Sequence, residues 1–465
     1  MSIVAKQASA PAKKIRLNAF AANGPVHLSP GFWTHPEDRS LEYKTIDHWL
    51  DLARLLERGK FDALFLADGN GVNDVYGGSA DTAIRLGAQI PRGDPFVVVP
   101  AMAAVTRHLG FGVTGNVSYE PCVPFARRLT TLDHITGGRI AWNIVTGFLA
   151  SAAKAQGQAK VTAHDTRYDI ADEYMEVMYK LWEGSWQDDA VIADRATGQF
   201  AAPERVHKIK HDGEHFHVEA IFMSEPSPQR TPLLFQAGAS TRGRAFAGRH
   251  AECVFVSGPS RQVIAPIVAD TRRKAAEQGR DPHDIRFFSL ATVIVAPTQA
   301  EASAKFDEYT RYINQEAALA MFSSWTGTDF SSHDLGAPIP YVVRDAAMNS
   351  AIESFTIADP DRVWTLREMM MHNAIGGRGP VFVGDPISVA DALQSWVADT
   401  NVDGFNLSYA LMPNDFRDFI DLVVPELQSR GVYKRHYAAG PLREKLFGPG
   451  RARVLDTHPA SIFRA

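Results

Sequence analysis

The amino-acid sequence predicts an α/β fold, namely a (β/α)8 TIM barrel with several insertions. Short apolar stretches of strand length alternate along the chain with longer stretches in which apolar residues recur at helical spacing. The short stretches are apolar on both faces, which is typical of a parallel sheet covered by helices. Eight such strands can be traced, and this number fits a closed barrel better than an open sheet.

The first half of the chain contains four strand–helix units. In the first helix, Ile46, Trp49 and Ala53 recur on one face. The third helix ends at Gly137 and Gly138, because glycine adopts the left-handed conformation that helix ends need. We expect strands at 15–20, 61–66, 110–117 and 139–145, and helices at 43–60, 96–109, 124–135 and 165–182.

The second half of the chain repeats this alternation of strands and helices, interrupted by two long segments that lack the alternation. The runs LLFQ and CVFV are compact apolar strands, and each is followed by a stretch of helical character. We expect strands at 233–236, 253–256, 287–295 and 404–408, and helices at 241–247, 264–278, 300–316, 389–397 and 416–428.

These elements predict one barrel domain at residues 15–430, with insertions at about 70–94, 184–231 and 317–380. Residues 1–14 lack the apolar core of a secretory signal and are expected to be a disordered leader. The tail at 431–465 is polar, contains Pro and Gly, and is a candidate oligomer contact. The segment 70–94 is rich in Gly and lacks periodicity, so we interpret it as an active-site loop.

The composition excludes several classes of protein. A net charge of −5 and a pI near 6.4 argue against nucleic acid or a phospholipid surface as the main partner. No apolar run approaches the roughly 20 residues of a membrane-spanning helix. The two cysteines, Cys122 and Cys253, lie among apolar residues and are expected to be buried free thiols. We therefore expect a cytoplasmic protein without a disulfide framework.

Polar residues fall at or near the carboxyl ends of successive strands, where barrel enzymes place their chemistry. Each has an ordinary structural alternative: Asp68 and Gly69 could form a simple turn, and Thr114 could be a core hydroxyl. Their common position favours a shared pocket. The members of this set are His27, Asp68, Thr114, Asn143, Thr146, His164, Tyr168 and Ser240.

The stretch QAGASTRGR at 236–244 is the best candidate for a phosphate site. A buried strand ends there, small residues let the backbone approach a ligand, and a helix begins at Ser240 or Thr241. Free N–H groups and the positive end of the helix dipole favour an anion, to which Arg242 or Arg244 could add charge. The alternative is an ordinary Ser N-cap. The stretch is neither a Walker A nor a G-x-G-x-x-G motif.

The sequence lacks the residue patterns that several other chemistries need. His207, His211, His215 and His217 invite a zinc interpretation, but the segment is typical of a surface hairpin turning at Asp212-Gly213. We therefore expect no metal. No G-x-S-x-G elbow lies near a His/Asp pair, and Asp68 is the one carboxylate clearly at a strand end, so hydrolysis of esters or glycosides is disfavoured.

Several longer stretches carry a family resemblance. The chain resembles the bacterial luciferase-like flavin-dependent monooxygenases, in the group of nitrilotriacetate, dibenzothiophene-sulfone and dimethyl-sulfide monooxygenases. Its 171–191 segment, ADEYMEVMYKLWEGSWQDDAV, and the ending VDGFNLSYA are most similar to the dimethyl-sulfide subgroup. The stretches that carry the resemblance are LERGKFDALFLADG, AMAAVTRHLGFGVT, ARRLTTLDHITGGRIAWNIVTG, HDTRYDIADEYMEVMYKLWEGSW, EPSPQRTPLLFQAGASTRGRAFA and DGFNLSYALMP.

The resemblance implies an enzyme that uses reduced FMN and O2, with the FMN delivered by a separate NAD(P)H:flavin reductase. Ser240 would hold the phosphate, Tyr168 and His164 the phosphate or ribityl chain, and Thr114 and Asn143 the ring edge. Phe20 and Phe65 would be apolar walls. The FMN-binding residues carried over by motif are Asp68, Thr114, Asn143, His164, Tyr168, Ala239 and Ser240.

For catalysis we single out His27 as the group that transfers protons near the flavin, since the usual histidine pKa suits neutral pH. Trp325 is a candidate substrate wall. Arg378, in IGGRGP, is a candidate substrate-binding residue, although a surface position in a Gly turn is the ordinary alternative. The family also suggests a homodimer or homotetramer.

The predicted reaction is oxidation of a small organosulfur or related heteroatom compound, with cleavage of a carbon–heteroatom bond. The alternatives within this chemistry are an aminopolycarboxylate, which extra cationic pocket residues would favour, an aromatic sulfone, or a flavin cleaved at its side chain. A non-catalytic flavin-binding protein and a deazaflavin-dependent dehydrogenase are the alternatives of other classes.

Overall fold

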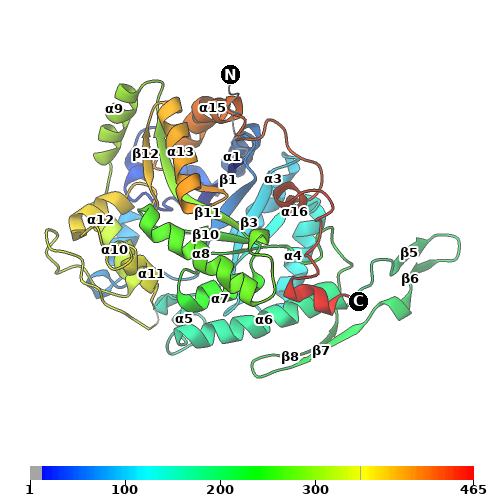
Figure 1. Cartoon of the computed structure of the whole chain (residues 1–465). Helices are drawn as coiled ribbons and strands as arrows, with labels where there is room; N and C mark the ends of the chain where they lie inside the picture. The colour runs from blue at the N-terminus through cyan, green and yellow to red at the C-terminus, as the bar shows by residue number, and fades with distance from the viewer. Residues whose placement is uncertain (1–12, 346) are drawn as a thin grey trace, which may run out of the picture.

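Eight parallel strands close into a barrel in the computed structural model, which describes residues 13–345 and 347–465 (Figure 1). The ring closes because β1 pairs with β13 and β10 pairs with β11. This architecture confirms the predicted (β/α)8 fold. In chain order the barrel strands are β1 (Arg16–Ala22), β2 (Ala63–Ala67), β3 (Gly110–Asn116), β4 (Ile140–Val145), β9 (Leu233–Gln236), β10 (Cys253–Val256), β11 (Arg286–Val295) and β13 (Gly404–Ser408).

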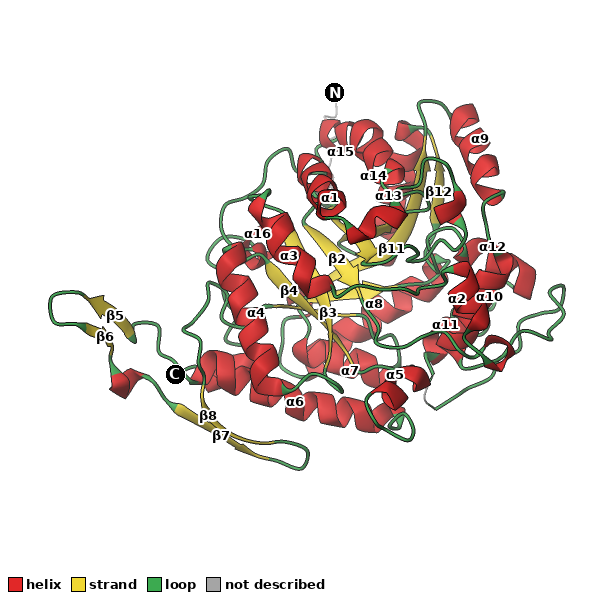
Figure 2. Cartoon of the chain, turned by 180° about the vertical axis from the view of Figure 1, so that it is seen from behind, coloured by secondary structure: helices red, strands yellow, loops and turns green. Residues whose placement is uncertain are grey.

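Helices surround the barrel on its outer face (Figure 2). Their buried faces and the outward side chains of the strands form one large apolar cluster, in which Trp142 of β4 lies between Phe125 and Trp182. The covering helices are α1 (Ile46–Arg58), α3 (Pro95–Ala104), α4 (Cys122–Thr136), α6 (His164–Gly184), α7 (Thr241–His250), α8 (Arg261–Glu277), α13 (Pro386–Thr400), and α14 (Asn414–Asp418) continued through the π-helical turn η6 (Phe419–Val423) into α15 (Val424–Ser429).

Aromatic rings fill the inside of the barrel. Phe65 of β2 stacks between Phe20 of β1 and Phe255 of β10, with ring centroids 4.7 and 4.4 Å apart. Phe235 and Phe288 complete this inner cluster. Large side chains can meet there because Gly112 of β3 leaves room, since a Cβ at position 112 would lie 2.6 Å from the Phe235 ring. The packed rings leave any cavity to the carboxyl ends of the strands.

Three segments differ from the sequence-based expectation. A ninth short strand, β12 (Val381–Gly384), pairs with the carboxyl half of β11. The helix expected at 300–316 is present as α9 (Gln299–Thr310) but ends earlier than expected. Asn314 caps a separate α10 (Gln315–Thr326), most of which lies in the expected insertion, by accepting a hydrogen bond from Ala317 N. Segment 70–94 also contains a short helix, α2 (Asp81–Leu86).

The larger insertions lie outside the barrel. Residues of 184–231 form two projecting hairpins, β5 (Val191–Asp194) with β6 (Gln199–Ala201) and β7 (Lys208–Asp212) with β8 (His217–Ile221) (Figures 1 and 2). The second hairpin turns after Asp212, as predicted. In 317–380, α10 packs with α11 (Asn349–Glu353) and α12 (Leu366–Asn373). The remaining short elements are α5 (Ala150–Ala155), α16 (Leu442–Phe447), and the 3-10 turns η1 (Phe32–Thr34), η2 (Ser40–Lys44), η3 (Tyr76–Gly78), η4 (Pro203–Arg205), η5 (Pro282–Asp284) and η7 (Pro459–Phe463).

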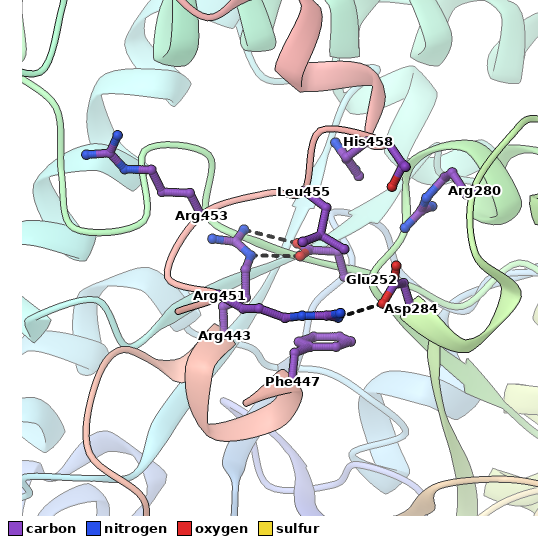
Figure 3. Close-up of a pocket in the computed structure, with 10 residues that line it drawn as sticks. Glu252, Arg280, Asp284, Arg443, Phe447, Arg451, Arg453, Leu455 and His458 are labelled. Carbon is purple, nitrogen blue, oxygen red and sulfur yellow. Dashed lines mark hydrogen bonds and ion pairs between the residues drawn. The ribbon is translucent and has the colours of Figure 1, made fainter. Parts of the chain in front are cut away.

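The described part of the C-terminal tail closes the amino end of the barrel. Leu442 and Leu446 of α16 join the inner aromatic cluster. Arg443 is buried and donates to both carboxylate oxygens of Glu252, at 2.7 and 3.0 Å (Figure 3). It also donates to the carbonyl of Thr231. The tail is thus held to its own barrel by an ion pair as well as by apolar contact. Within the described residues, no helix is both long enough and apolar enough to cross a membrane.

The Arg443–Glu252 pair generates a stability prediction. Arg443→Met should lower the free energy of unfolding by about 3–5 kcal/mol, because it leaves a buried carboxylate without its cation. Chemical denaturation followed by fluorescence measures this loss. The double variant Arg443→Met/Glu252→Gln should recover a large part of it. A double variant that loses the sum of both single effects would show that the ion pair is not the source.

Candidate functional site

Two adjoining hollows open at the carboxyl ends of the strands. The inner cavity, of about 250 Å³, lies directly above the aromatic cluster, so Phe20, Phe65 and Phe255 line it. The outer cleft, of about 1100 Å³, extends over the start of α7 and along α6. Asp68, Ala237 and other residues line both. The hollows are therefore continuous, and one elongated ligand could occupy them together.

The structure brings every predicted site residue to one of these hollows. Asp68, Thr114 and Asn143, at the ends of β2, β3 and β4, lie at the inner cavity. Thr146, just after β4, lies at the outer cleft with the residues of α6 and the β9–α7 turn. The inner cavity is lined by His27, Asp68, Thr114, Asn143, Trp325 and Arg378. The outer cleft is lined by Asp68, Thr146, His164, Tyr168, Ala239 and Ser240.

Thr114 and Asn143 form a pre-oriented polar pair. They are register partners on β3 and β4. Asn143 Nδ2 donates to Thr114 Oγ1 at 3.1 Å, and Thr114 Oγ1 donates to the Leu66 carbonyl at 3.0 Å. The chain leaves Asn143 Oδ1 buried without a hydrogen-bond partner among the described residues. Because an unpaired buried acceptor is costly, this oxygen suits a ligand N–H group.

His27 is more deeply enclosed than the sequence indicates. The rings of His27 and Phe20 form a T-shaped contact, with centroids 4.3 Å apart. His27 Nδ1 has no hydrogen-bond partner among the described residues. Burial, reinforced by the nearby charge of Arg92, lowers the pKa of His27 to about 3. The expectation of a pKa near neutrality is therefore wrong. The imidazole is neutral at pH 7 and can exchange hydrogen bonds, but it does not store a proton as a cation.

The β9–α7 turn forms a cradle for an anion. Ser240 Oγ caps α7 by accepting from Gly243 N at 3.0 Å, so the N-cap alternative also holds. A Cβ at Gly238 would lie 2.3 Å from Gln236 Nε2 and 2.6 Å from the Tyr168 hydroxyl. Glycine thus brings the backbone close to these polar groups. The helix start opens into the outer cleft, where its free N–H groups can meet a phosphate.

Neither arginine proposed for this cradle offers a free charge. Arg242 pairs with Asp169 and Asp172, and Arg244 pairs with Asp270. Their charges are balanced within the protein, which corrects the expectation that one of them neutralises a phosphate. The cradle would bind an anion mainly through helix N–H groups and hydroxyls.

These groups fit FMN. The anion cradle lies in the outer cleft, the unpaired acceptor Asn143 Oδ1 lies in the inner cavity, and the two are continuous. A flat ring with N–H groups and a phosphate on a flexible chain matches this arrangement.

Sequence reasoning missed several cavity residues that loops contribute. Arg92 lines the inner cavity, where its Nε donates to the Gln89 carbonyl at 3.0 Å. Burial raises the pKa of Asp68, and the nearby charge of Arg92 partly opposes this rise. Arg92 lies in the Gly-rich segment 70–94, where no periodicity tells which side chains face inward.

The second large insertion covers the inner cavity. Trp325 of α10 is 8% exposed, and its carbonyl accepts from Met348 N at 2.9 Å. Arg378 Nη1 donates to the Ser350 carbonyl at 3.3 Å, and its Nη2 lies 3.5 Å from Met348 Sδ. These contacts join α10, the start of α11 and the IGGRGP segment into one roof.

The histidines of the hairpin do not gather as metal ligands. His211 contacts Glu173 and Lys180, and His217 contacts Asp212. Among the described residues, no three His, Cys, Asp or Glu side chains are placed to hold a metal ion.

Comparison with known proteins gives consistent matches over nearly the whole chain. The family model described as luciferase-like monooxygenase matches residues 28–403. Dimethyl-sulfide monooxygenase of Hyphomicrobium sulfonivorans is 47% identical over 97% of this chain and 94% of its own length. Long-chain alkane monooxygenase of Geobacillus thermodenitrificans is 45% identical over 97% and 98%. The crystal structure of a riboflavin lyase with modified FMN and riboflavin superposes with a TM-score of 0.90, at 36% identity, covering 97% of this chain and all of that one.

The burial of His27 generates a prediction about pH. Its folded pKa of about 3 lies below the ordinary 6.5, so the unfolded chain binds a proton that the folded chain excludes as pH falls between these values. Stability is therefore lost toward acid, by up to about 1.4 kcal/mol per pH unit from this group. His27→Gln should make the fall in unfolding free energy between pH 6 and 4 shallower. Urea denaturation at several pH values measures it, with the exposed His436→Gln as control. Parallel curves for wild type and His27→Gln would contradict the burial argument.

Proposed function

The chain belongs to the luciferase-like monooxygenase family, and on that premise we propose that it is a two-component flavin-dependent monooxygenase. It uses reduced FMN and O2 to oxidise a small organosulfur or related heteroatom compound, with cleavage of a carbon–heteroatom bond. A separate NAD(P)H:flavin reductase supplies the reduced flavin. The observation that carries this proposal is the continuity of an anion cradle at Ser240 with a cavity that contains the unpaired oxygen of Asn143.

Bound reduced FMN supplies the electrons that activate O2. Ser240 and the first N–H groups of α7 bind the phosphate, beside the Tyr168 hydroxyl. Asn143, held by Thr114, accepts a hydrogen bond from the ring edge and so orients it. These groups sit on rigid strands and a helix start, which keeps the cofactor in one position.

The remaining residues protect and serve the reaction. The aromatic floor and the insertion roof at Trp325 cover the inner cavity from two sides and so would limit the entry of water and wasteful side reactions. His27 stays neutral and has Nδ1 unpaired, so it can accept a proton or a hydrogen bond from the substrate side. It returns such a proton readily, because its buried cation is unfavourable.

The substrate assignment rests on the relatives and on the cavity. The relative named for dimethyl sulfide supports an organosulfur compound, whereas the relative named for long-chain alkanes has a substrate without a heteroatom. The alternatives keep the same cofactor and change the substrate to an aminopolycarboxylate, an aromatic sulfone or a flavin; the riboflavin lyase supports the last. A non-catalytic flavin-binding protein is disfavoured, because it would need neither the covering insertions nor the polar cavity.

Turnover tests the proposal directly. The protein mixed with FMN, NADH and a flavin reductase should consume O2 when an organic sulfide is added. A methyl sulfide should release formaldehyde and the corresponding thiol. Absence of substrate-dependent turnover with sulfides, sulfones and aminocarboxylates would remove the monooxygenase proposal.

The phosphate role of Ser240 has a separate test. Ser240→Ala should weaken FMN binding several-fold and leave riboflavin binding nearly unchanged, because riboflavin lacks the phosphate. Thr298→Ala is the matched control, since Thr298 caps α9 in the same way, outside both hollows. Each variant should also lose about 1 kcal/mol of stability through its cap. Flavin fluorescence titration measures both affinities, and equal weakening of FMN and riboflavin would contradict the role.

A further inference from the structure

Arg378 places a positive charge in the inner cavity, and no carboxylate of the described residues pairs with it. None of the ion pairs among the described residues includes it. Its guanidinium donates to the Ser350 carbonyl and lies near Met348 Sδ, both of which are uncharged. Burial, with no opposing charge, lowers the pKa of Arg378 to about 10, so the side chain is still a cation at pH 7. A partly buried cation of this kind is unfavourable unless an anion joins it.

The backbone fixes Arg378 in this position. Its glycine neighbours press against β11: a Cβ at Gly379 would lie 2.2 Å from the Leu290 carbonyl oxygen, and one at Gly376 would lie 1.7 Å from Thr292 Oγ1. Gly376 and Gly377 have φ values of +83° and +94°, which other residues rarely adopt. The segment cannot easily move away, so the charge is a built feature of the cavity and not a surface side chain.

The other charges of the cavity offset each other. The charged side chains that line it, among the described residues, are Asp68, Arg92 and Arg378. Asp68 and Arg92 attract each other, since each moves the pKa of the other toward the charged form. His27 is neutral at pH 7. The cavity therefore has one positive charge in excess.

The excess charge is separate from the proposed flavin contacts. Arg378 lies over β11, whereas Thr114 and Asn143 lie on β3 and β4. In the strand order of the barrel, β9 and β10 separate β4 from β11 on one side. The anion cradle for the phosphate is in the outer cleft, which Arg378 does not line. The groups nearest Arg378 instead belong to the insertion roof.

We propose that Arg378 binds an anionic group of the substrate, so that the substrate is a small organosulfur acid, either a thioether carboxylate or a thioether sulfonate. This inference rests on the proposed function and deepens it. A guanidinium binds either group through two parallel N–H donors. A single excess charge matches one anionic group and disfavours an aminopolycarboxylate, whose further charges would be left unpaired.

The test compares matched sulfides in the reductase-coupled assay. The charged arms are (methylthio)acetate and 2-(methylthio)ethanesulfonate, and the neutral arms are ethyl methyl sulfide and 2-(methylthio)ethanol. We expect kcat/KM for at least one acid to exceed that for its neutral counterpart about tenfold or more, the change that one charge-assisted hydrogen bond produces. The better of the two acids identifies the anionic group.

Variants of Arg378 test whether this residue causes the preference for acids over neutral sulfides. Arg378→Met should raise KM for the preferred acid about tenfold or more and leave the neutral sulfides nearly unchanged, so the preference disappears. Arg378→Lys should retain part of it. The exposed Arg54→Met, on α1, is the matched control and should behave as wild type. The Tm of Arg378→Met should not fall, because the variant removes a cation that has no carboxylate partner.

A binding measurement keeps the inference distinct from the proposed function. Titration of flavin-free protein with (methylthio)acetate should change tryptophan fluorescence, and the signal should be lost in Trp325→Phe and weakened in Arg378→Met. Turnover of neutral sulfides at equal or higher kcat/KM than the acids would overturn the inference while the monooxygenase function stands. A loss of FMN affinity in Arg378→Met, with the acid preference unchanged, would overturn it by assigning Arg378 to the flavin. Acid binding without turnover of any sulfide, sulfone or aminocarboxylate would instead remove the proposed function.

Discussion

The stack of aromatic rings inside the barrel is the constraint on which the rest of the structure depends. Phe65 lies between Phe20 and Phe255, and these rings belong to the apolar cluster inside the barrel. From below, Leu442 of the C-terminal tail packs against the same cluster. Because this core is full, free space exists above it, at the carboxyl ends of the strands. The position of the site is thus a consequence of packing, and the tail contributes to it from the opposite end of the barrel.

Two kinds of element build the site above this floor, and they differ in rigidity. Asn143 and Thr114 project from strands that are fixed on both sides by neighbouring strands, and Ser240 caps a helix. Trp325 and Arg378 belong to the insertion that forms the roof. The strands hold the unpaired oxygen of Asn143 in a fixed orientation. Leaving this oxygen unpaired costs free energy, which the packing of the barrel offsets. The roof residues depend on a few contacts among themselves, such as that between Arg378 and Ser350.

This division explains which parts of the structure the sequence predicts. Strands and helices follow from periodicity, and the carboxyl ends of strands meet by necessity, so Asp68, Thr114 and Asn143 could be placed together without coordinates. Loops have no such rule. Arg92 lies in a segment without periodicity, β12 directly follows an insertion, and α10 lies almost entirely within the segment expected to be that insertion. The prediction of the His27 pKa is wrong for a different reason. This pKa depends on how completely other elements enclose the imidazole ring, which is a property of the tertiary structure.

The same division accounts for relatives with one barrel and different named substrates, from dimethyl sulfide to long-chain alkanes. A change in Phe65 or Gly112 would disturb the core and the cofactor floor together. A change at position 378 would alter one charge in the roof, while the glycines beside it keep the segment against β11. Substrate choice can therefore vary at low structural cost, provided that the strand ends stay as they are. Among the described residues of this chain, the roof carries an arginine without a carboxylate partner, and the proposed preference for an anionic substrate rests on that charge.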